Sequence, residues 1–229
     1  CSTAAGPAFE GGRILHGIGG IAGAIEHVDF SKEKIYTTIK QLEPIGICGS
    51  GILDLVAELL KSRIIDKSGR MQKAGESQGL ATAELQERIT VTDDQTAFLI
   101  DKQAGIIFTQ KDVREFQLAK AAVSAGVSTL LAHLELNVQN INTLYLAGGL
   151  GSNMNVGNAA LVGLIPQELT QKTIAAGNTS GAGAIRALLS KEFCRQMTIT
   201  AKKIEYIDLA LRDDFGQQFI RELDFPENG

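Results

Sequence analysis

Residues 141–153, INTLYLAGGLGSN, contain an apolar run that passes directly into a glycine-rich turn. The length and composition of 141–147 predict a buried β-strand. Gly148 and Gly149 follow this strand, and because glycine leaves the backbone bare, another molecule can approach closely there. We therefore expect an α/β fold with a ligand-binding turn at the end of this strand.

Two more glycine-rich loops lie next to predicted helices. The segment 46–51, GICGSG, precedes an amphipathic helix predicted over 52–65, with Ser50 as its N-cap. The segment 177–183, GNTSGAG, precedes a helix predicted over 184–194. Backbone N–H groups at a helix start attract anions such as phosphate. None of the three loops matches a Walker P-loop or a dinucleotide fingerprint, and a single glycine turn is often only structural. Three in one chain favour a binding role.

The rest of the chain predicts short strands and helices within one domain, 1–229, that has a β-rich insertion at about 66–108. Short apolar runs between turn residues predict strands, and three- and four-residue apolar spacing predicts helices. A helix that starts after a capping Thr109 should extend to about Leu136. The other predicted strands are 22–28, 35–42, 89–91, 97–100, 106–108, 173–176 and 204–209, and the other predicted helices are 156–161 and 215–223.

The composition is that of a globular protein, with 44% hydrophobic and 21% charged residues. The 22 Lys and Arg against 26 Asp and Glu give a net charge of −4. We expect no nucleic-acid or anionic-membrane partner, because both need a basic face on the protein. No apolar run approaches the roughly 18 residues that a membrane span needs. No leader typical of a signal peptide opens the chain, so we expect a cytoplasmic protein.

The three cysteines, Cys1, Cys48 and Cys194, are odd in number and far apart in sequence. This pattern fits neither a disulfide framework nor a zinc site. The three histidines also lack the spacing of metal ligands. We therefore expect reduced thiols and no metal site.

Few side chains offer catalytic chemistry. Glu10 is an acid within an apolar, glycine-rich loop, which makes it a catalytic candidate, although a surface turn would also explain it. Gln117 and Lys120 flank alanines on the long helix, where they could contact a ribose or a phosphate or could face solvent. Ser50 lies in Cys-Gly-Ser-Gly, but the glycine offset is wrong for a hydrolase nucleophile and no partner His or Asp is apparent.

Several blocks keep a common order along nearly the whole chain and resemble the reductive activators of corrinoid proteins. The blocks are AGPAFEG at 5–11, GICGSG at 46–51, TQKDVREFQLAK at 109–120, LAGGLG at 146–151, GLIP at 163–166, GNT at 177–179 and the Phe-Pro pair at 225–226. Such activators use ATP to drive an electron onto an inactive cobalt(II) corrinoid and return it to the cobalt(I) state used in methyltransferase systems.

The resemblance implies the fold of the acetate and sugar kinase, chaperone and actin ATPases, which is a ribonuclease H-like mixed sheet flanked by helices. It implies ATP with Mg²⁺ as cofactor, a corrinoid protein as partner, and a homodimer. For the nucleotide it implies Gly148, Gly149, Gly151, Gly177 and Asn178, with Gln117 and Lys120 in a secondary role. Gly49, Ser50 and Gly51 would hold phosphate or shape the cleft between domains.

Two features of the family pattern are not in this sequence. The family places an Asp-Ile-Gly-Thr-Asn-Gly-Glu phosphate loop just before the stretch that starts at Cys1. It also places a [2Fe–2S] cluster in an N-terminal ferredoxin domain, whose ligands three scattered cysteines cannot replace. Leu150 stands where the family usually has Phe. By this resemblance the chain supplies part of a nucleotide site and is not a fully active enzyme on its own.

Three other functions remain open from the sequence. A related activator ATPase could serve a 2-hydroxyacyl-CoA dehydratase, although Cys48 and Cys194 lack the surrounding pattern of its bridging cluster. A small-molecule kinase of the same superfamily would phosphorylate a small acceptor. A non-enzymatic scaffold would bind a partner protein and use its glycine loops only structurally.

Overall fold

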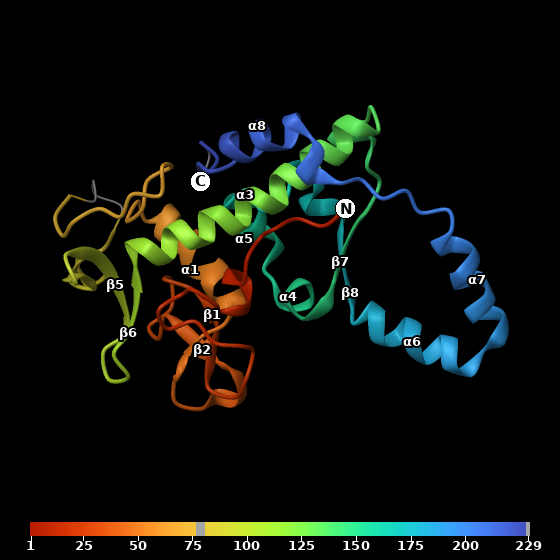
Figure 1. The fold of residues 1–229 in the computed structure, drawn as a ribbon. Helices are drawn as coiled ribbons and strands as arrows, with labels where there is room; N and C mark the ends of the chain where they lie inside the picture. Colours follow the sequence, from red (N-terminus) through yellow and green to blue (C-terminus); the bar gives the residue numbers. More distant parts are fainter. Residues whose placement is uncertain (77–80, 228–229) are drawn as a thin grey trace.

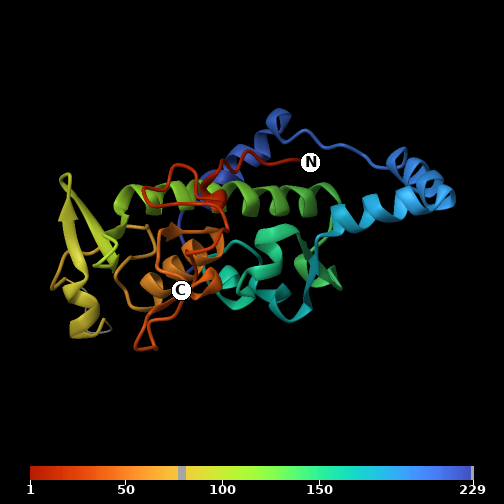
Figure 2. The ribbon, with the colours of Figure 1, turned by 90° about the horizontal axis from the view of Figure 1, so that it is seen from below.

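The computed structural model describes residues 1–76 and 81–227, which form an α/β fold built around one long helix (Figure 1). The long helix is α3, Gln110–His133. A β-meander lies at one end of α3, and the helices α6 and α7 extend beyond its other end (Figures 1 and 2). The α/β class predicted from the sequence is confirmed, with the strands distributed over three small sheets.

The first sheet has the order β2-β1-β3, with β1 at Ala24–Val28, β2 at Tyr36–Thr38 and β3 at Gly46–Ile47. β1 pairs antiparallel with β2 and parallel with β3. Helix α1, Gly49–Lys61, follows β3 directly and is buried along most of its length. The strand predicted at 22–28 is confirmed, whereas the one predicted at 35–42 is shorter because a 3-10 helix begins at Ile39.

The N-terminus of α1 differs from the prediction. Cys48 is the N-cap, and Ser50 lies inside the first turn of the helix. The prediction of Ser50 as N-cap is therefore wrong. The amphipathic spacing used to locate the start could not mark Gly49, Ser50 and Gly51, because the helix begins before its first large apolar residue. Close packing around Gly49 excludes any side chain at that position.

A three-stranded antiparallel meander confirms the short strands predicted between 89 and 108. It consists of β4 (Ile89–Thr92), β5 (Gln95–Asp101) and β6 (Ile106–Thr109), and the helix α2 (Ala83–Glu87) precedes it. Phe98 and Phe108, which lie opposite each other on β5 and β6, are fully buried. Phe116 of α3 is also fully buried and packs against Phe9 and Phe225. Thr109 caps α3 in a capping box with Asp112, as predicted.

The third sheet carries the glycine-rich turns. Its strands are β7 (Leu144–Ala147) and β8 (Thr173–Gly177), which run parallel. Between them are α4 (Gly148–Asn153) and α5 (Val156–Leu161), and α6 (Thr179–Leu189) follows β8. The strand predicted at 173–176 and the helix predicted at 156–161 are confirmed. The strand predicted at 141–147 begins at Leu144, and its predicted burial is wrong, because Tyr145 is 65% exposed and no residue of β7 is fully buried.

The C-terminal part differs most from the sequence prediction. The helix predicted at 184–194 is two helices, α6 and α7 (Lys191–Ala201), because Ser190 is extended and its side chain caps α7. Residues 204–208 are irregular and a 3-10 helix, Leu209–Leu211, follows, so the strand predicted at 204–209 is wrong. Its apolar residues have no neighbouring strand to pair with among the described residues. Helix α8, Asp213–Arg221, packs along α3 (Figure 1).

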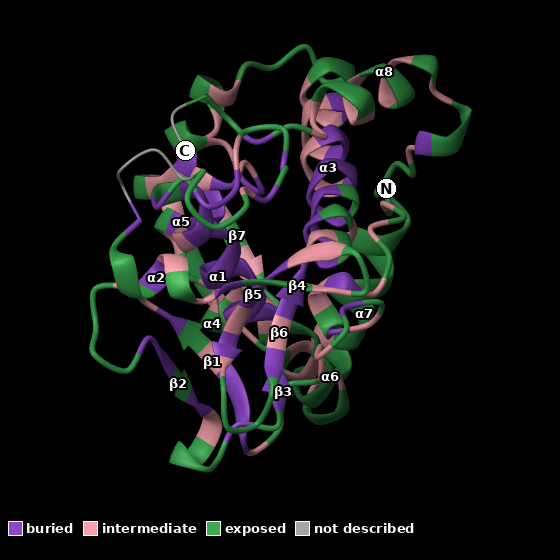
Figure 3. Cartoon of the chain, turned by 90° about the vertical axis from the view of Figure 1, so that its left-hand side faces the viewer, coloured by how far each residue is buried: buried purple, intermediate pink, exposed green. Residues whose placement is uncertain are grey.

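Burial is uneven along the molecule (Figure 3). The core joins α1, α3, α5 and the first two sheets. Helices α6 and α7 contribute no buried residue, and Leu188 and Leu189 are 87% and 83% exposed. In the part of the chain that the structure describes, no helix is long and apolar enough to cross a membrane.

Candidate functional site

Two of the predicted glycine-rich loops meet at one edge of the third sheet. β7 and β8 are parallel, and Ala147 lies opposite Gly177. The carboxyl ends of both strands therefore lie at the same edge, where α4 begins at Gly148 and α6 is capped by Asn178. Ligands in α/β proteins bind at this end of parallel strands.

The backbone at this edge is open. A Cβ atom placed on Gly148, Gly149 or Gly177 would have no heavy atom within 4 Å, so packing within the chain does not require glycine there. Gly148 and Gly177 have φ angles of +92° and +69°, which favour glycine for conformational reasons. The Asn178 side chain accepts a hydrogen bond from the Gly181 amide at 2.9 Å and so fixes the start of α6. The edge is a bare backbone surface.

The third glycine-rich loop adjoins this edge through Leu150. A Cβ on Gly49 would lie 3.2 Å from Leu150 Cδ1 and 2.0 Å from the backbone oxygen of Phe9. A Cβ on Gly51 would lie 2.3 Å from the backbone oxygen of Ile25. These two glycines are therefore required by packing around the start of α1.

The remaining predicted residues near this site are partly enclosed. Gly151 packs against Leu146, since a Cβ there would lie 3.1 Å from its carbonyl carbon. Ser50 is buried, with its Oγ 3.5 Å from Cys48 Sγ. Glu10 ends the 3-10 helix Ala8–Glu10, which packs against α1, and its side chain is exposed.

Gln117 and Lys120 lie elsewhere and bind the C-terminal strap, which we define as residues 222–227. Lys120 is fully buried, and its Nζ donates to the backbone oxygens of Glu222 at 2.5 Å and Asp224 at 2.7 Å. Gln117 Nε2 donates to the backbone oxygen of Leu223 at 2.9 Å. Both side chains thus have protein partners that occupy their hydrogen-bonding groups.

Burial also changes the acidity of Lys120. Removal of the ammonium from water lowers its pKa to about 8, against the opposing effect of the Glu222 and Asp224 carboxylates. The Nζ also lies 5.6 Å from the centre of the Phe225 ring. The lysine is therefore an internal anchor of the strap.

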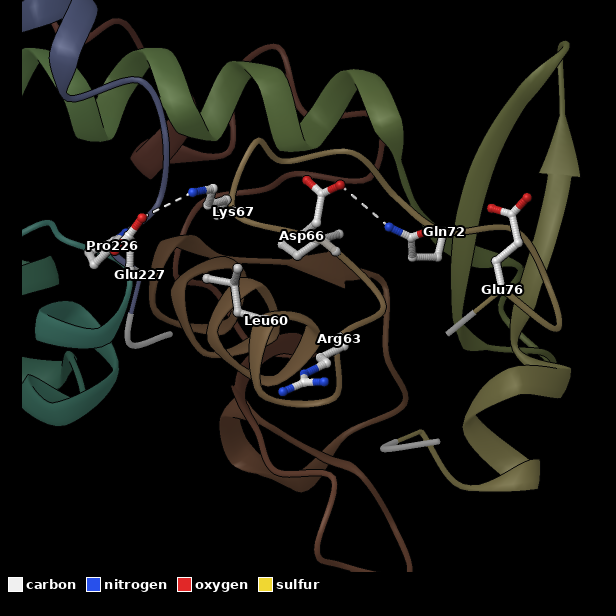
Figure 4. Close-up of a pocket in the computed structure, with 9 residues that line it drawn as sticks. Leu60, Arg63, Asp66, Lys67, Gln72, Glu76, Pro226 and Glu227 are labelled. Atoms are coloured by element: carbon white, nitrogen blue, oxygen red, sulfur yellow. Dashed lines mark hydrogen bonds and ion pairs between the residues drawn. The ribbon is translucent and has the colours of Figure 1, made fainter. Parts of the chain in front are cut away.

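The far end of the strap borders a cavity of about 330 Å³ at the C-terminal end of α1 (Figure 4). The Phe225 amide donates to the backbone oxygen of Lys67 at 2.8 Å, and Lys67 Nζ pairs with Glu227 at 3.1 Å. This cavity lies about 18 Å along α1 from its N-terminal glycines, given a rise of about 1.5 Å per residue. It is separate from the open backbone edge.

One polar cluster was missed by sequence reasoning. Asp54, on α1, is 3% exposed and bonds to His27 on β1 and to Asn158 on α5. The sequence signal is an acid inside the apolar run ILDLVAELL, which a buried helix carries only when the carboxylate has partners. The prediction of an amphipathic helix rested on the apolar residues of that run and gave Asp54 no role.

The described residues hold no group of three or more His, Cys, Asp or Glu side chains arranged for a metal ion. The three cysteines are free, with Cys48 buried at the start of α1 and the other two exposed. Residues 1–76 and 81–227 therefore offer no ligand set for an iron–sulfur cluster.

Comparison with known proteins identifies relatives over the full length of the chain. Residues 1–229 match the family model described as the C-terminal domain of RACo, the ASKHA domain. The corrinoid activation enzyme RamQ of Eubacterium limosum is 34% identical over 235 residues, which cover 99% of this chain and 39% of that protein. A [Co(II) methylated amine-specific corrinoid protein] reductase of Methanosarcina barkeri is 26% identical over 253 residues, which cover 100% of this chain and 42% of that protein.

A solved structure agrees with these relatives. A reductive activator for corrinoid, iron–sulfur protein superposes with a TM-score of 0.85 at 34% identity, over 100% of this chain and 36% of that chain. The chain therefore spans about two fifths of the length of the curated relatives. The matched proteins act on corrinoid proteins, as the sequence resemblance predicted, and none of the three is a dehydratase activator or a small-molecule kinase.

Proposed function

Since the chain belongs to the family of C-terminal ASKHA domains of reductive corrinoid activators, we propose that it binds the adenosine part of ATP in a protein that returns cobalt(II) corrinoid proteins to the cobalt(I) state. The observation that carries the proposal is the open backbone at Gly148, Gly149 and Gly177. A nucleotide can lie flat over a strand end only where side chains are absent.

The chain's own residues support this role in different ways. Asn178 fixes the first turn of α6, whose amides would face bound phosphate or ribose oxygens. Gly49, Gly51 and Gly151 shape the walls by close packing. The structure gives Ser50, Gln117 and Lys120 protein partners, so they have no direct part in the proposal. Glu10 remains a catalytic candidate from the sequence.

The [2Fe–2S] cluster of the predicted activator does not fit the described residues of this chain, because its three free cysteines belong to no group of potential metal ligands. We therefore assign no electron-transfer step to these residues. Mg²⁺ at the nucleotide, a homodimer, a corrinoid partner and a cytoplasmic location stay predictions for the complete protein.

Calorimetric titration with ATP and Mg²⁺ tests the proposal. We compare this chain, the complete protein, and a Gly149→Val variant of each. The valine has space in the folded chain but covers the backbone edge, so we expect ATP affinity to fall by tenfold or more with little change in melting temperature.

Gly216→Val is the matched control, because Gly216 also has no heavy atom within 4 Å of an added Cβ and lies on α8. Equal ATP affinity in the wild type and Gly149→Val would contradict the assignment of the edge. An absence of binding by the complete protein would remove the ATPase function and favour a partner-binding scaffold.

A further inference from the structure

A connected polar cluster joins β1, α1 and α5. Asp54 Oδ2 bonds to His27 Nδ1 at 3.0 Å, and Asp54 Oδ1 accepts from Asn158 Nδ2 at 2.7 Å. Lys61 Nζ donates to Asn158 Oδ1 at 2.9 Å and to Glu58 Oε1 at 2.7 Å. The cluster borders a surface pocket of about 310 Å³, which the half-buried Asp29 also lines.

The cluster fixes the orientation of the Asn158 amide. Lys61 can only donate, so its contact identifies the Asn158 oxygen and directs the amide nitrogen toward Asp54. Asp54 is almost fully buried, and a buried carboxylate is costly unless it is hydrogen-bonded. The pair Asp54–Asn158 is therefore a strong and directional link between α1 and α5.

Helix α5 depends on such links. It has six residues, which is too short for a helix to be stable without tertiary contacts. Helix α4, which carries Gly148 and Gly149, has no buried residue of its own. Only Met154 and Asn155 separate α4 from α5, so the position of α5 determines where the C-terminal end of α4 lies.

We propose that Asp54 is a positioning residue for the nucleotide site: through Asn158 it holds α5 against α1 and thereby fixes the α4 turn. The proposal rests on the proposed function for its consequence in binding, but its structural part concerns this chain alone. In this proposal Asp54 acts on the site through Asn158, while its bond to His27 holds the carboxylate in place.

The test swaps the carboxylate and the amide between positions 54 and 158. Asn158→Asp places two carboxylates face to face, so we expect faster amide hydrogen exchange over 148–158 and roughly tenfold weaker ATP binding, the effect of losing one buried hydrogen bond to a charged group. The double variant Asp54→Asn with Asn158→Asp restores one donor and one acceptor and places the new carboxylate beside Lys61. It should recover both exchange protection and affinity.

Asn140→Asp, at an exposed asparagine, is the control for the charge change. Hydrogen exchange on the free chain needs no nucleotide, so it judges the positioning role even if ATP does not bind. Unchanged exchange at 148–153 in Asn158→Asp would overturn the proposal. The proposal would also be overturned if amides 148–153 exchanged as fast in the double variant as in Asn158→Asp. Rescue by the swapped pair is expected only if the Asp54–Asn158 hydrogen bond itself holds α4, and not if Asn158→Asp lowers stability in general.

Discussion

Lys120 should make the stability of this chain depend on pH in the alkaline range. Its pKa is about 8 in the folded protein, whereas a lysine in the unfolded, solvated chain has the ordinary value of 10.5. Between these values the unfolded chain binds more protons than the folded one, so the free energy of unfolding rises with pH. The stabilisation is complete above the unfolded pKa and is lost as the pH falls through about 8.

The size of this effect follows from the difference between the two pKa values. Each pKa unit of difference corresponds to about 1.4 kcal/mol, so the unfolding free energy changes by about 3 kcal/mol. Lys120→Met removes the ionisable group and keeps much of the side-chain volume. The difference in unfolding free energy between the wild type and this variant should therefore rise by about 3 kcal/mol from pH 7 to pH 10.5, because other titrating groups cancel in the comparison.

Urea unfolding across this pH range measures the difference directly. Lys111→Met, at an exposed lysine on the same helix, is the control and should give a difference that does not change with pH. A flat profile for Lys120→Met would refute the argument, since it would mean that the ammonium is equally solvated in the folded and unfolded states.

Two further substitutions test local packing and capping. Gly51→Ala should lower the free energy of unfolding by about 1–3 kcal/mol, because the new Cβ would lie 2.3 Å from the Ile25 oxygen. Gly183→Ala is the comparison, because Gly183 lies on α6 with no heavy atom within 4 Å of an added Cβ, and it should stabilise the fold by up to about 1 kcal/mol. Equal changes in unfolding free energy for Gly51→Ala and Gly183→Ala in urea titrations would contradict the packing argument. Thr109→Ala should cost about 1 kcal/mol by removal of the α3 cap, measured by thermal melting; no change would show that the capping box is not needed.

Local patterns predicted the elements whose signals are local. The apolar run and glycines at 141–149 located β7 and its turn, and Thr109 located the start of α3. The break at Ser190 was missed because apolar spacing continues across it, although the serine side chain that caps α7 is itself a sequence signal for a helix start. The irregular segment 204–208 was misread because a strand needs a neighbour that one segment cannot show.

At the candidate site, too, local features could be predicted from the sequence and long-range contacts could not. Glycine content located the open edge, but sequence does not distinguish glycines that leave room for a ligand, such as Gly149, from those that packing requires, such as Gly51. The assignment of Lys120 to a ligand failed to anticipate a partner about 100 residues away in the strap. Long-range contacts of this kind depend on how the chain closes on itself, which no local pattern encodes.

The buried amine of Lys120 has a consequence for chemical modification of the protein. Acetylation and most lysine-directed reagents need a free, accessible amine, whereas this one is fully buried and donates to two backbone oxygens of the strap. The reactivity of Lys120 therefore reports when the C-terminus has docked: it can be labelled during synthesis or after release of the last six described residues, but not in the closed fold. An acetyl group added early would remove its charge and leave an amide too large for the space, so the modified chain would keep its C-terminus undocked.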